Sequence, residues 1–192
     1  MPMSPEPDTA LVALIDREQA PLLARRFYGE GHASPITASL AQVPELLEVT
    51  LPFIAAALGP AGLDERAKEI AVLRTSVLLE CRYCVETHTA VALDVGLASD
   101  EVRALRGELP IESTFPDPRD LTMIEWIDAV ALGPGTVEPA VRARASAALE
   151  DHALVELTLT VAATLMLNRY CTALGLPTGV AALERLAEEG FA

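Results

Sequence analysis

The chain has 192 residues and a formal net charge of −14, from 14 Lys and Arg against 28 Asp and Glu. Such an acidic chain repels phosphate groups, which argues against nucleic acids and anionic membranes as partners. Hydrophobic residues make up 51% of the chain but aromatic residues only 4%, and this Ala- and Leu-rich composition favours helices over strands.

The N-terminal stretch, MPMSPEPDTALVALIDREQ, has prolines and an acid where a secretory signal would have basic residues. From about Asp8 to Tyr28 the pattern predicts one or two helices, with Pro21 marking a break. The most apolar segment begins at Leu154, is interrupted by Glu156 and is shorter than the roughly 20 residues that cross a bilayer. We therefore expect a soluble, cytoplasmic protein.

The rest of the chain shows helical periodicity, interrupted by loops that contain glycine and proline. Asp64 is well placed to cap a helix that runs to about Leu79, since apolar residues follow it at helical spacing. The next helix begins near Cys81 and ends at Gly96, and Ser99 caps a short helix after it. The pattern predicts an all-α fold, and with no internal repeat we expect one domain over residues 1–192. Predicted helices span residues 37–41, 44–58, 64–79, 81–95, 99–107, 117–131, 138–148, 151–174 and 180–189, with a loop at 109–118.

Two of the three cysteines and one of the three histidines lie in the segment ECRYCVETH. Cys81, Cys84 and His88 are spaced i, i+3 and i+7, so on a helix they share one face. A thiol at the start of a helix lies among unpaired backbone N–H groups, which lowers its pKa and favours the nucleophilic thiolate. His88 is one turn beyond Cys84 and near enough to accept its proton. The segment therefore contains an attacking thiol, a resolving thiol and a base.

Glu69, twelve residues before Cys81, is a candidate partner for this histidine. On its helix it borders Val72 and Leu73, at the rim of the apolar stripe. A carboxylate there would orient His88 and take its proton, as the third member of a proton relay. The simpler interpretation is a solvated carboxylate on the helix surface.

Two other interpretations of the cysteine segment stay open. The cysteines could be small buried hydrophobic residues, although their spacing from His88 would then be a coincidence. The segment could also bind zinc through three ligands, but no second Cys/His pair lies at zinc-finger spacing, so we favour redox chemistry and expect no metal. A fourth zinc ligand would come from Glu69, His32, His152 or Cys171. Without zinc, we interpret Cys171 as an inert core thiol and the remaining histidines as structural residues.

The pattern E-x11-C-x-x-C-x3-H, here Glu69, Cys81, Cys84 and His88, resembles the alkylhydroperoxidase D / carboxymuconolactone decarboxylase superfamily, in its peroxidase-related branch. The surrounding LDERAKEIAVLRTSVLLECRYCVETHTAVALDVGL is similar to the two-helix motif of that family, and MLNRYCTALGLP to the end of its long helix. The resemblance covers about residues 51–177. It implies an all-helical bundle that assembles as trimers or hexamers.

The resemblance also implies a thiol peroxidase. Cys84 would be the peroxidatic thiolate that attacks a hydroperoxide and becomes a sulfenic acid, and Cys81 would resolve it as a disulfide. His88 would deprotonate Cys84, supported by Glu69 through a water. An external dithiol would reduce the disulfide, which in the best-known members is a dihydrolipoyl group on a carrier protein. The thiols carry the electrons, so no bound cofactor is implied.

One position departs from the family pattern, because Tyr83 stands where the best-known members have a second histidine. A phenol is a poor base at neutral pH. Asn168 and Arg169 are candidates for lining the site or for joining subunits. Two rival functions stay open: a carboxymuconolactone decarboxylase-like enzyme without redox chemistry, which has no need of two cysteines, and an oligomeric redox sensor without turnover.

Overall fold

The computed structural model describes residues 10–29, 33–133 and 135–191. These residues form helices and no strand, so the all-α prediction is confirmed. None of the helices in this part of the chain combines the length and the apolar character needed to cross a bilayer. The elements are η1 (Arg25–Phe27, a 3-10 turn), α1 (Pro35–Leu40), α2 (Pro44–Leu58), α3 (Glu65–Leu78), α4 (Arg82–Asp94), α5 (Ser99–Leu105), α6 (Ile111–Thr114), α7 (Pro118–Leu132), α8 (Pro139–Ala148), α9 (Asp151–Leu174) and α10 (Val180–Glu188).

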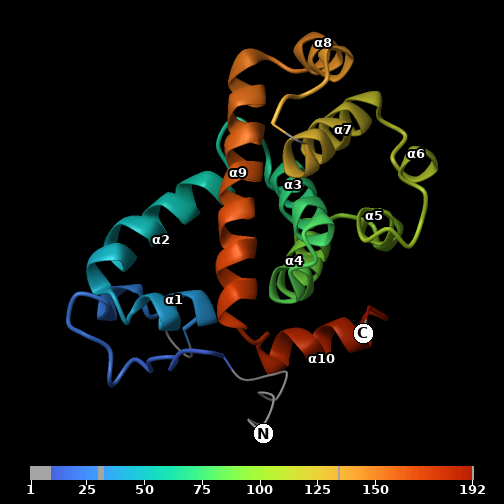
Figure 1. Cartoon of the computed structure of the whole chain (residues 1–192). Coiled ribbons are helices and arrows are strands. Elements are labelled where there is room, and N and C mark those ends of the chain that lie inside the picture. Colours follow the sequence, from blue (N-terminus) through green and yellow to red (C-terminus); the bar gives the residue numbers. More distant parts are fainter. Residues whose placement is uncertain (1–9, 30–32, 134, 192) are drawn as a thin grey trace, which may run out of the picture.

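The long helix α9 runs through the middle of the molecule, with α1 and α2 on one side and α3, α4 and α7 on the other (Figure 1). Helix α3 lies against α4, α7 and α9, and its apolar residues belong to the largest cluster of buried side chains. Even the polar Lys68 and Glu69 of α3 are buried. Helix α3 is therefore the helix around which the others are arranged.

The buried Lys68 joins three helices. Its ammonium group lies 2.8 Å from Glu156 Oε1 on α9, and it donates to the Ala57 carbonyl of α2 at 2.8 Å and to Thr160 Oγ1 of α9 at 3.1 Å. Glu156 also accepts hydrogen bonds from two backbone N–H groups in the loop before α3. A buried charge needs such pairing to be tolerated, so this network fixes how α2 and α9 lie against α3.

Most predicted helices begin and end within one or two residues of the observed ones. Asp64 caps α3 as predicted, since its carboxylate accepts the backbone N–H three residues later at 2.8 Å. Gly96 follows α4 with φ 90°, the conformation expected where glycine ends a helix. The prediction for Ser99 is wrong, because it is the first helical residue of α5. The Ala98 N–H donates to Glu101 Oε2 at 2.9 Å, so Ala98 is the capping position.

The prediction of one or two helices between Asp8 and Tyr28 is wrong for the described residues; Asp8 itself lies outside them. Only η1 is helical between residues 10 and 28. Long-range contacts replace helical hydrogen bonds there, and the Leu11 N–H donates to the Leu174 carbonyl at 2.9 Å. Tertiary pairing thus overrides local propensity. The predicted loop at 109–118 likewise contains the short helix α6.

The turn between α3 and α4 contains a strained residue. Glu80 has φ 54° and is the one residue other than glycine with positive φ in the described part of the chain. This left-handed conformation costs an L-residue about 1–2 kcal/mol. The turn closes through hydrogen bonds from the Glu80 N–H to the Val77 carbonyl at 3.0 Å and from the Cys81 N–H to the Ser76 carbonyl at 3.1 Å. As a result Cys81 lies at the N-terminus of α4, beside the end of α3.

We predict that Glu80→Gly raises the free energy of unfolding by up to about 1 kcal/mol, because glycine adopts positive φ without a Cβ clash but loses more backbone entropy on folding. Ala187→Gly is the matched control, since Ala187 is exposed on α10. That change should lower the free energy of unfolding by about 1 kcal/mol. Urea denaturation followed by circular dichroism measures both. Equal losses in the two variants would show that the turn is not strained.

Candidate active site

The C-x-x-C pair lies at the start of α4. Cys81 is the N-cap residue and Cys84 follows in the first turn. Both are free thiols, with exposed fractions of 1% and 4%, and their Sγ atoms are 2.8 Å apart. At this distance the two sulfurs share a hydrogen bond, and only a small movement separates them from a disulfide. The pair is thus a dithiol able to close.

His88 and Glu69 meet across the contact between α4 and α3. His88 Nδ1 lies 2.8 Å from Glu69 Oε2, and Glu69 is only 7% exposed. The solvated-surface interpretation of Glu69 is therefore wrong. The predicted link through a water is also wrong, because the two side chains are in direct contact. A carboxylate that holds Nδ1 fixes the ring and leaves Nε2 for proton exchange.

The third cysteine lies against the dithiol, where sequence reasoning placed no functional residue. Cys171, in the last turns of α9, is 1% exposed and packs in the same buried cluster as Cys81 and Cys84. The three thiols form one buried cluster with Leu176. It is a core thiol as expected, but its neighbours are sulfurs. One feature of the sequence could have pointed to Cys171, namely its place in MLNRYCTALGLP, the segment similar to the end of the family's long helix.

Asn168, one helical turn before Cys171, also belongs to the site. Its Nδ2 donates to Ser76 Oγ at 3.1 Å, and its side chain hydrogen-bonds the Cys84 thiol. Its Oδ1 is buried and has no hydrogen-bond partner among the described residues. Arg169 is exposed on α9. Of this pair of candidates, only Asn168 therefore contacts the dithiol.

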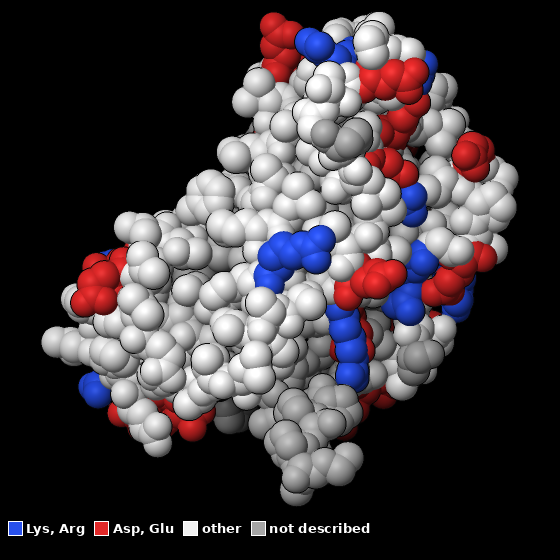
Figure 2. All heavy atoms as spheres, in the orientation of Figure 1, with Lys and Arg blue, Asp and Glu red and all other residues white. Residues whose placement is uncertain are grey.

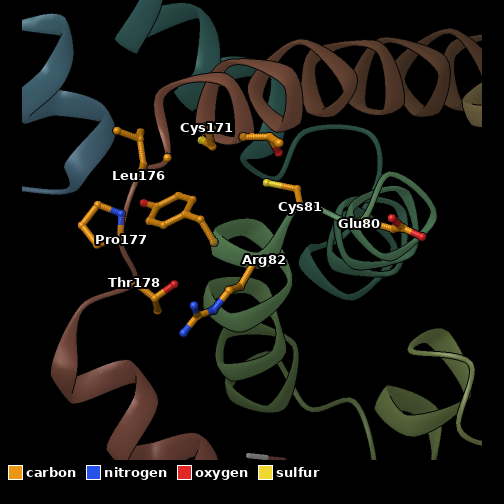
Figure 3. A pocket seen from close by; sticks show the side chains of 10 residues that line it. Glu80, Cys81, Arg82, Cys171, Leu176, Pro177 and Thr178 are labelled. Atoms are coloured by element: carbon orange, nitrogen blue, oxygen red, sulfur yellow. The ribbon is translucent and has the colours of Figure 1, made fainter. Parts of the chain in front are cut away.

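Two cavities border the thiols from different sides. The first, here the His88 cavity, has a volume of about 240 Å³ and is lined by Cys84, His88 and Asn168 together with apolar residues of α1, α2, α3 and α9. The second, the Cys171 cavity, has a volume of about 170 Å³ and is lined by Cys81 and Cys171 (Figure 3). Tyr83 lines both cavities. Each sulfur of the C-x-x-C pair thus borders a different space.

The zinc interpretation finds no support in the arrangement of side chains. Within residues 10–29, 33–133 and 135–191, no group of three or more His, Cys, Asp or Glu is placed to hold a metal ion. His152 is exposed at the start of α9, where its Nδ1 lies 3.4 Å from Glu150 Oε2. His32, the other histidine considered as a ligand, lies outside the described residues.

Comparisons with known proteins agree with this geometry. Residues 44–111 match the sequence model of the Carboxymuconolactone decarboxylase family, a span that includes Glu69, Cys81, Cys84 and His88. This span of the chain is therefore similar to the Carboxymuconolactone decarboxylase family. The resemblance predicted from the cysteine motif is thereby confirmed.

A curated relative and several solved structures are similar to this chain over most of its length. The uncharacterized protein YnjA of Escherichia coli K12 is 29% identical over 173 residues, covering 89% of this chain and 92% of that protein. The alkylhydroperoxidase core of an uncharacterized peroxidase-related protein from Ralstonia eutropha JMP134 has a TM-score of 0.79 at 17% identity, over 90% of this chain and 94% of that one. The debrominase Bmp8, in complex with 2,3,4-tribromopyrrole, has a TM-score of 0.77 at 17% identity, over 94% and 97%. These neighbours establish an alkylhydroperoxidase D-like fold.

In this domain the thiol cluster carries its charge on Cys81. Hydrogen bonds from Cys171 and then from Cys84 lower the pKa of Cys81 to about 3. For Cys84, the hydrogen bond with Cys171 favours the thiolate, but the hydrogen bond with Cys81 and burial outweigh it and raise the pKa to about 12. The pKa of Cys171 is raised by the same neighbours, Cys81 first. The thiol placed at the helix terminus is thus the ionised one, whereas the family resemblance implied a thiolate at Cys84.

Tyr83 cannot replace the missing histidine as a base. Burial raises the pKa of its phenol, and the neighbouring cysteines raise it further. Its hydroxyl therefore stays protonated, and it hydrogen-bonds Thr87. Tyr83 lines both cavities, and the imidazole of His88 is left as the base in the wall of the His88 cavity.

The pKa of Cys81 gives a testable pH dependence. In the wild type we expect its alkylation by iodoacetamide at pH 5 to be nearly as fast as at pH 7, because both lie far above a pKa of about 3. Cys171→Ala removes the largest stabilising hydrogen bond, so the pKa rises and alkylation at pH 5 falls. Cys171→Ser keeps a donor and should lie between the two.

Mass spectrometry of tryptic peptides measures this labelling, since Cys81 and Cys84 fall in separate peptides, 75–82 and 83–103. Labelling of Cys84 in the same sample is the internal control, and it should be slow at both pH values. If Cys81 of the Cys171→Ala variant is alkylated at pH 5 as fast as in the wild type, Cys171 does not stabilise the thiolate.

Proposed function

We propose that this protein is a thiol-dependent hydroperoxide reductase in which Cys81 and Cys84 supply two electrons. The observation that supports it best is the buried thiol pair, 2.8 Å apart, whose Cys84 borders a cavity together with His88. His88 is held by Glu69, so a proton donor of fixed orientation lies beside the reacting sulfur. The peroxidase-related neighbours share this fold.

Cys84 is the proposed attacking sulfur, because it borders the His88 cavity while Cys81 borders the other one. Since Cys81 carries the resting charge, the Cys84 proton moves to Cys81 along their hydrogen bond as the attack begins. The Cys84 sulfur bonds the terminal peroxide oxygen and the O–O bond breaks. The alkoxide leaves as an alcohol with a proton from His88, and Cys84 is left as a sulfenic acid.

Resolution closes the dithiol. The Cys81 sulfur displaces the hydroxyl group from the Cys84 sulfenic acid, and the proton that Cys81 received completes a water molecule. One hydroperoxide and two thiols thus give an alcohol, water and a disulfide, and His88 regains its proton from solvent. An external dithiol then reduces the disulfide. By the family resemblance it is of the dihydrolipoyl class, carried by a partner protein, and no bound cofactor takes part.

The lining of the His88 cavity favours an organic hydroperoxide. Most of the surface that lines this cavity is apolar. Its volume of about 240 Å³ suits a small organic molecule. Asn168 Oδ1, which has no partner among the described residues, is available to accept a hydrogen bond from the peroxide O–H. The apolar wall residues include Ile36, Ile54, Leu58, Val72 and Leu167.

We extend the proposal to a homo-oligomer, either a trimer or a hexamer. Helices α2 and α9 expose large apolar side chains on one face, and Figure 2 shows this part of the surface as mostly uncharged. Exposed large apolar side chains gathered on two packed helices are typical of protein interfaces. The side chains are Leu46, Val49 and Phe53 on α2 and Val155, Leu159 and Met166 on α9.

A second candidate is reductive dehalogenation of a small aromatic ring. The debrominase Bmp8 shares the fold over most of both chains, and the apolar His88 cavity could hold such a ring. The same two electrons would be used. Decarboxylation of a lactone is supported less well, since the chemistry has no use for a closing dithiol, and a redox sensor would use the dithiol without turnover.

The first prediction for this function concerns the loss of thiols. One equivalent of cumene hydroperoxide should remove two free thiols from the fully reduced wild type and none from Cys84→Ser, because that variant lacks the attacking sulfur. Cys81→Ser should instead form a sulfenic acid that dimedone traps. Equal first oxidation of the two variants would contradict the assigned roles.

Turnover with dithiothreitol, measured alongside, separates the rival functions. A sensor would be oxidised once and then stop. Replacing the peroxide by 2,3,4-tribromopyrrole tests dehalogenation through bromide release. Thiols that react only after a chelator is added would indicate that the cysteines bind a metal ion. Thiols that never react would reject the proposed reductase.

The second prediction concerns the proton donor. His88→Ala should lower the rate of oxidation by about 100-fold, since it removes the group that protonates the leaving oxygen. Glu69→Gln should lower it by roughly tenfold, as for other groups that orient a histidine. Stopped-flow measurement of thiol oxidation gives both rates. His152→Ala and Glu65→Gln, both at exposed positions, are the controls; rates in the site variants equal to theirs would remove His88 and Glu69 from the mechanism.

A further inference from the structure

The proposed reaction uses two of the three thiols in the buried cluster and leaves Cys171 without a role. Cys171 comes from α9 and Cys81 from the turn before α4, yet both line the Cys171 cavity. Figure 3 shows their sulfur atoms turned toward the same space. Cys84 borders the His88 cavity on the other side. The sulfur of Cys81 therefore lies between two possible disulfide partners.

We propose that Cys171 is a third redox thiol, which exchanges with the Cys81–Cys84 disulfide to give a Cys81–Cys171 disulfide beside the Cys171 cavity. This inference rests on the proposed function, since peroxide reduction supplies the first disulfide. In this proposal the external dithiol acts at the Cys171 cavity, whereas the peroxide reacts in the His88 cavity.

The step is a thiol–disulfide exchange. The Cys171 sulfur attacks Cys81, the Cys81–Cys171 bond forms, and the Cys81–Cys84 bond breaks with its electron pair left on Cys84. The proton of Cys171 passes to Cys84, so no proton or electron is gained or lost by the protein. Cys81, Cys84 and Cys171 already lie in one buried cluster, and Cys81 and Cys171 share the wall of one cavity. Cys84 is then reduced again and still borders the His88 cavity.

The Cys171 cavity fits a narrow dithiol as the reductant. Its volume is about 170 Å³, and the two sulfurs at its wall are each only 1% exposed, so a bulky protein thiol cannot reach them. An unbranched dithiol arm or a small dithiol can enter. Thr178 Oγ1, also in the wall, is buried without a hydrogen-bond partner among the described residues and offers a polar contact. The external dithiol would reduce the Cys81–Cys171 disulfide from this side.

Disulfide mapping tests the exchange directly. Trypsin places the three cysteines in three separate peptides, 75–82, 83–103 and 170–185, so each disulfide gives its own cross-linked mass. The reduced wild type is treated with one equivalent of cumene hydroperoxide, quenched with acid and N-ethylmaleimide, and digested. We expect the 75–82/83–103 cross-link first, followed by the 75–82/170–185 cross-link. In Cys171→Ser only the first should form.

The serine variant also separates a redox role from a purely electrostatic one. Serine keeps a hydrogen-bond donor beside Cys81 but cannot form a disulfide. We expect reduction of the oxidised protein by dithiothreitol to slow on the order of tenfold in Cys171→Ser, because the thiol facing the reductant is lost. Reduction at the wild-type rate, with no 75–82/170–185 cross-link in the wild type, would overturn the inference.

A second variant shows whether the two sulfurs can bond at all. Cys84→Ser, oxidised with diamide, should give the 75–82/170–185 cross-link, and its absence in this folded variant would also reject the exchange. The proposed function has a separate signature. If peroxide gives the wild type no cross-link of any kind, the reductase itself is wrong. If it gives the 75–82/83–103 cross-link alone, only the third thiol is wrong.

Discussion

The reversal of the chain at Glu80 is the constraint on which the site depends. Because this residue takes a left-handed conformation, α4 turns back along α3 and Cys81 begins it. The same antiparallel contact lets His88 meet Glu69 at 2.8 Å. Lys68, the residue next to Glu69, is paired with α9 and α2 through its buried network, so the helix that carries the carboxylate is itself held in place. Strain at one residue is thus offset by contacts along the whole of α3.

The three thiols shift one another's pKa values, and the direction of each shift favours a thiolate at one sulfur over the others. A thiolate buried among apolar side chains would be unfavourable alone. Its two neighbouring thiols lower the pKa of Cys81, whereas the pKa of Cys84 is raised, so the thiolate is favoured at Cys81 rather than at the cysteine that borders the His88 cavity. In the proposed reaction Cys81 therefore acts first as the acceptor of the Cys84 proton and then as the second nucleophile. In this proposal the two roles follow from one hydrogen bond of 2.8 Å.

The all-α fold and the pairing of the two cysteines followed from helical periodicity and spacing, and both are local properties of the sequence. Glu69 was preferred to an ordinary surface carboxylate only through the family pattern, because a carboxylate between Lys68 and Ile70 resembles any surface residue until α3 is seen to be buried along most of its length. Cys171 was missed as a neighbour for a similar reason. It is 87 residues beyond Cys84, and only the packing of α9 against α4 brings them together. The prediction for the N-terminal segment failed for the opposite reason, since its local pattern is helical but its long-range hydrogen bonds are made to α1 and α9.

The two sides of the candidate site come from different parts of the chain. The span that matches the family, residues 44–111, contains the dithiol, the histidine and its carboxylate. Asn168 and Cys171 come from α9, outside that span, and they hydrogen-bond the sulfurs. A change in α9 can therefore alter which thiol is charged, and which cavity an oxidised cysteine faces, without any change in the C-x-x-C motif. In the proposed reaction the motif provides the electrons, and the helix packed against it sets where they enter and leave.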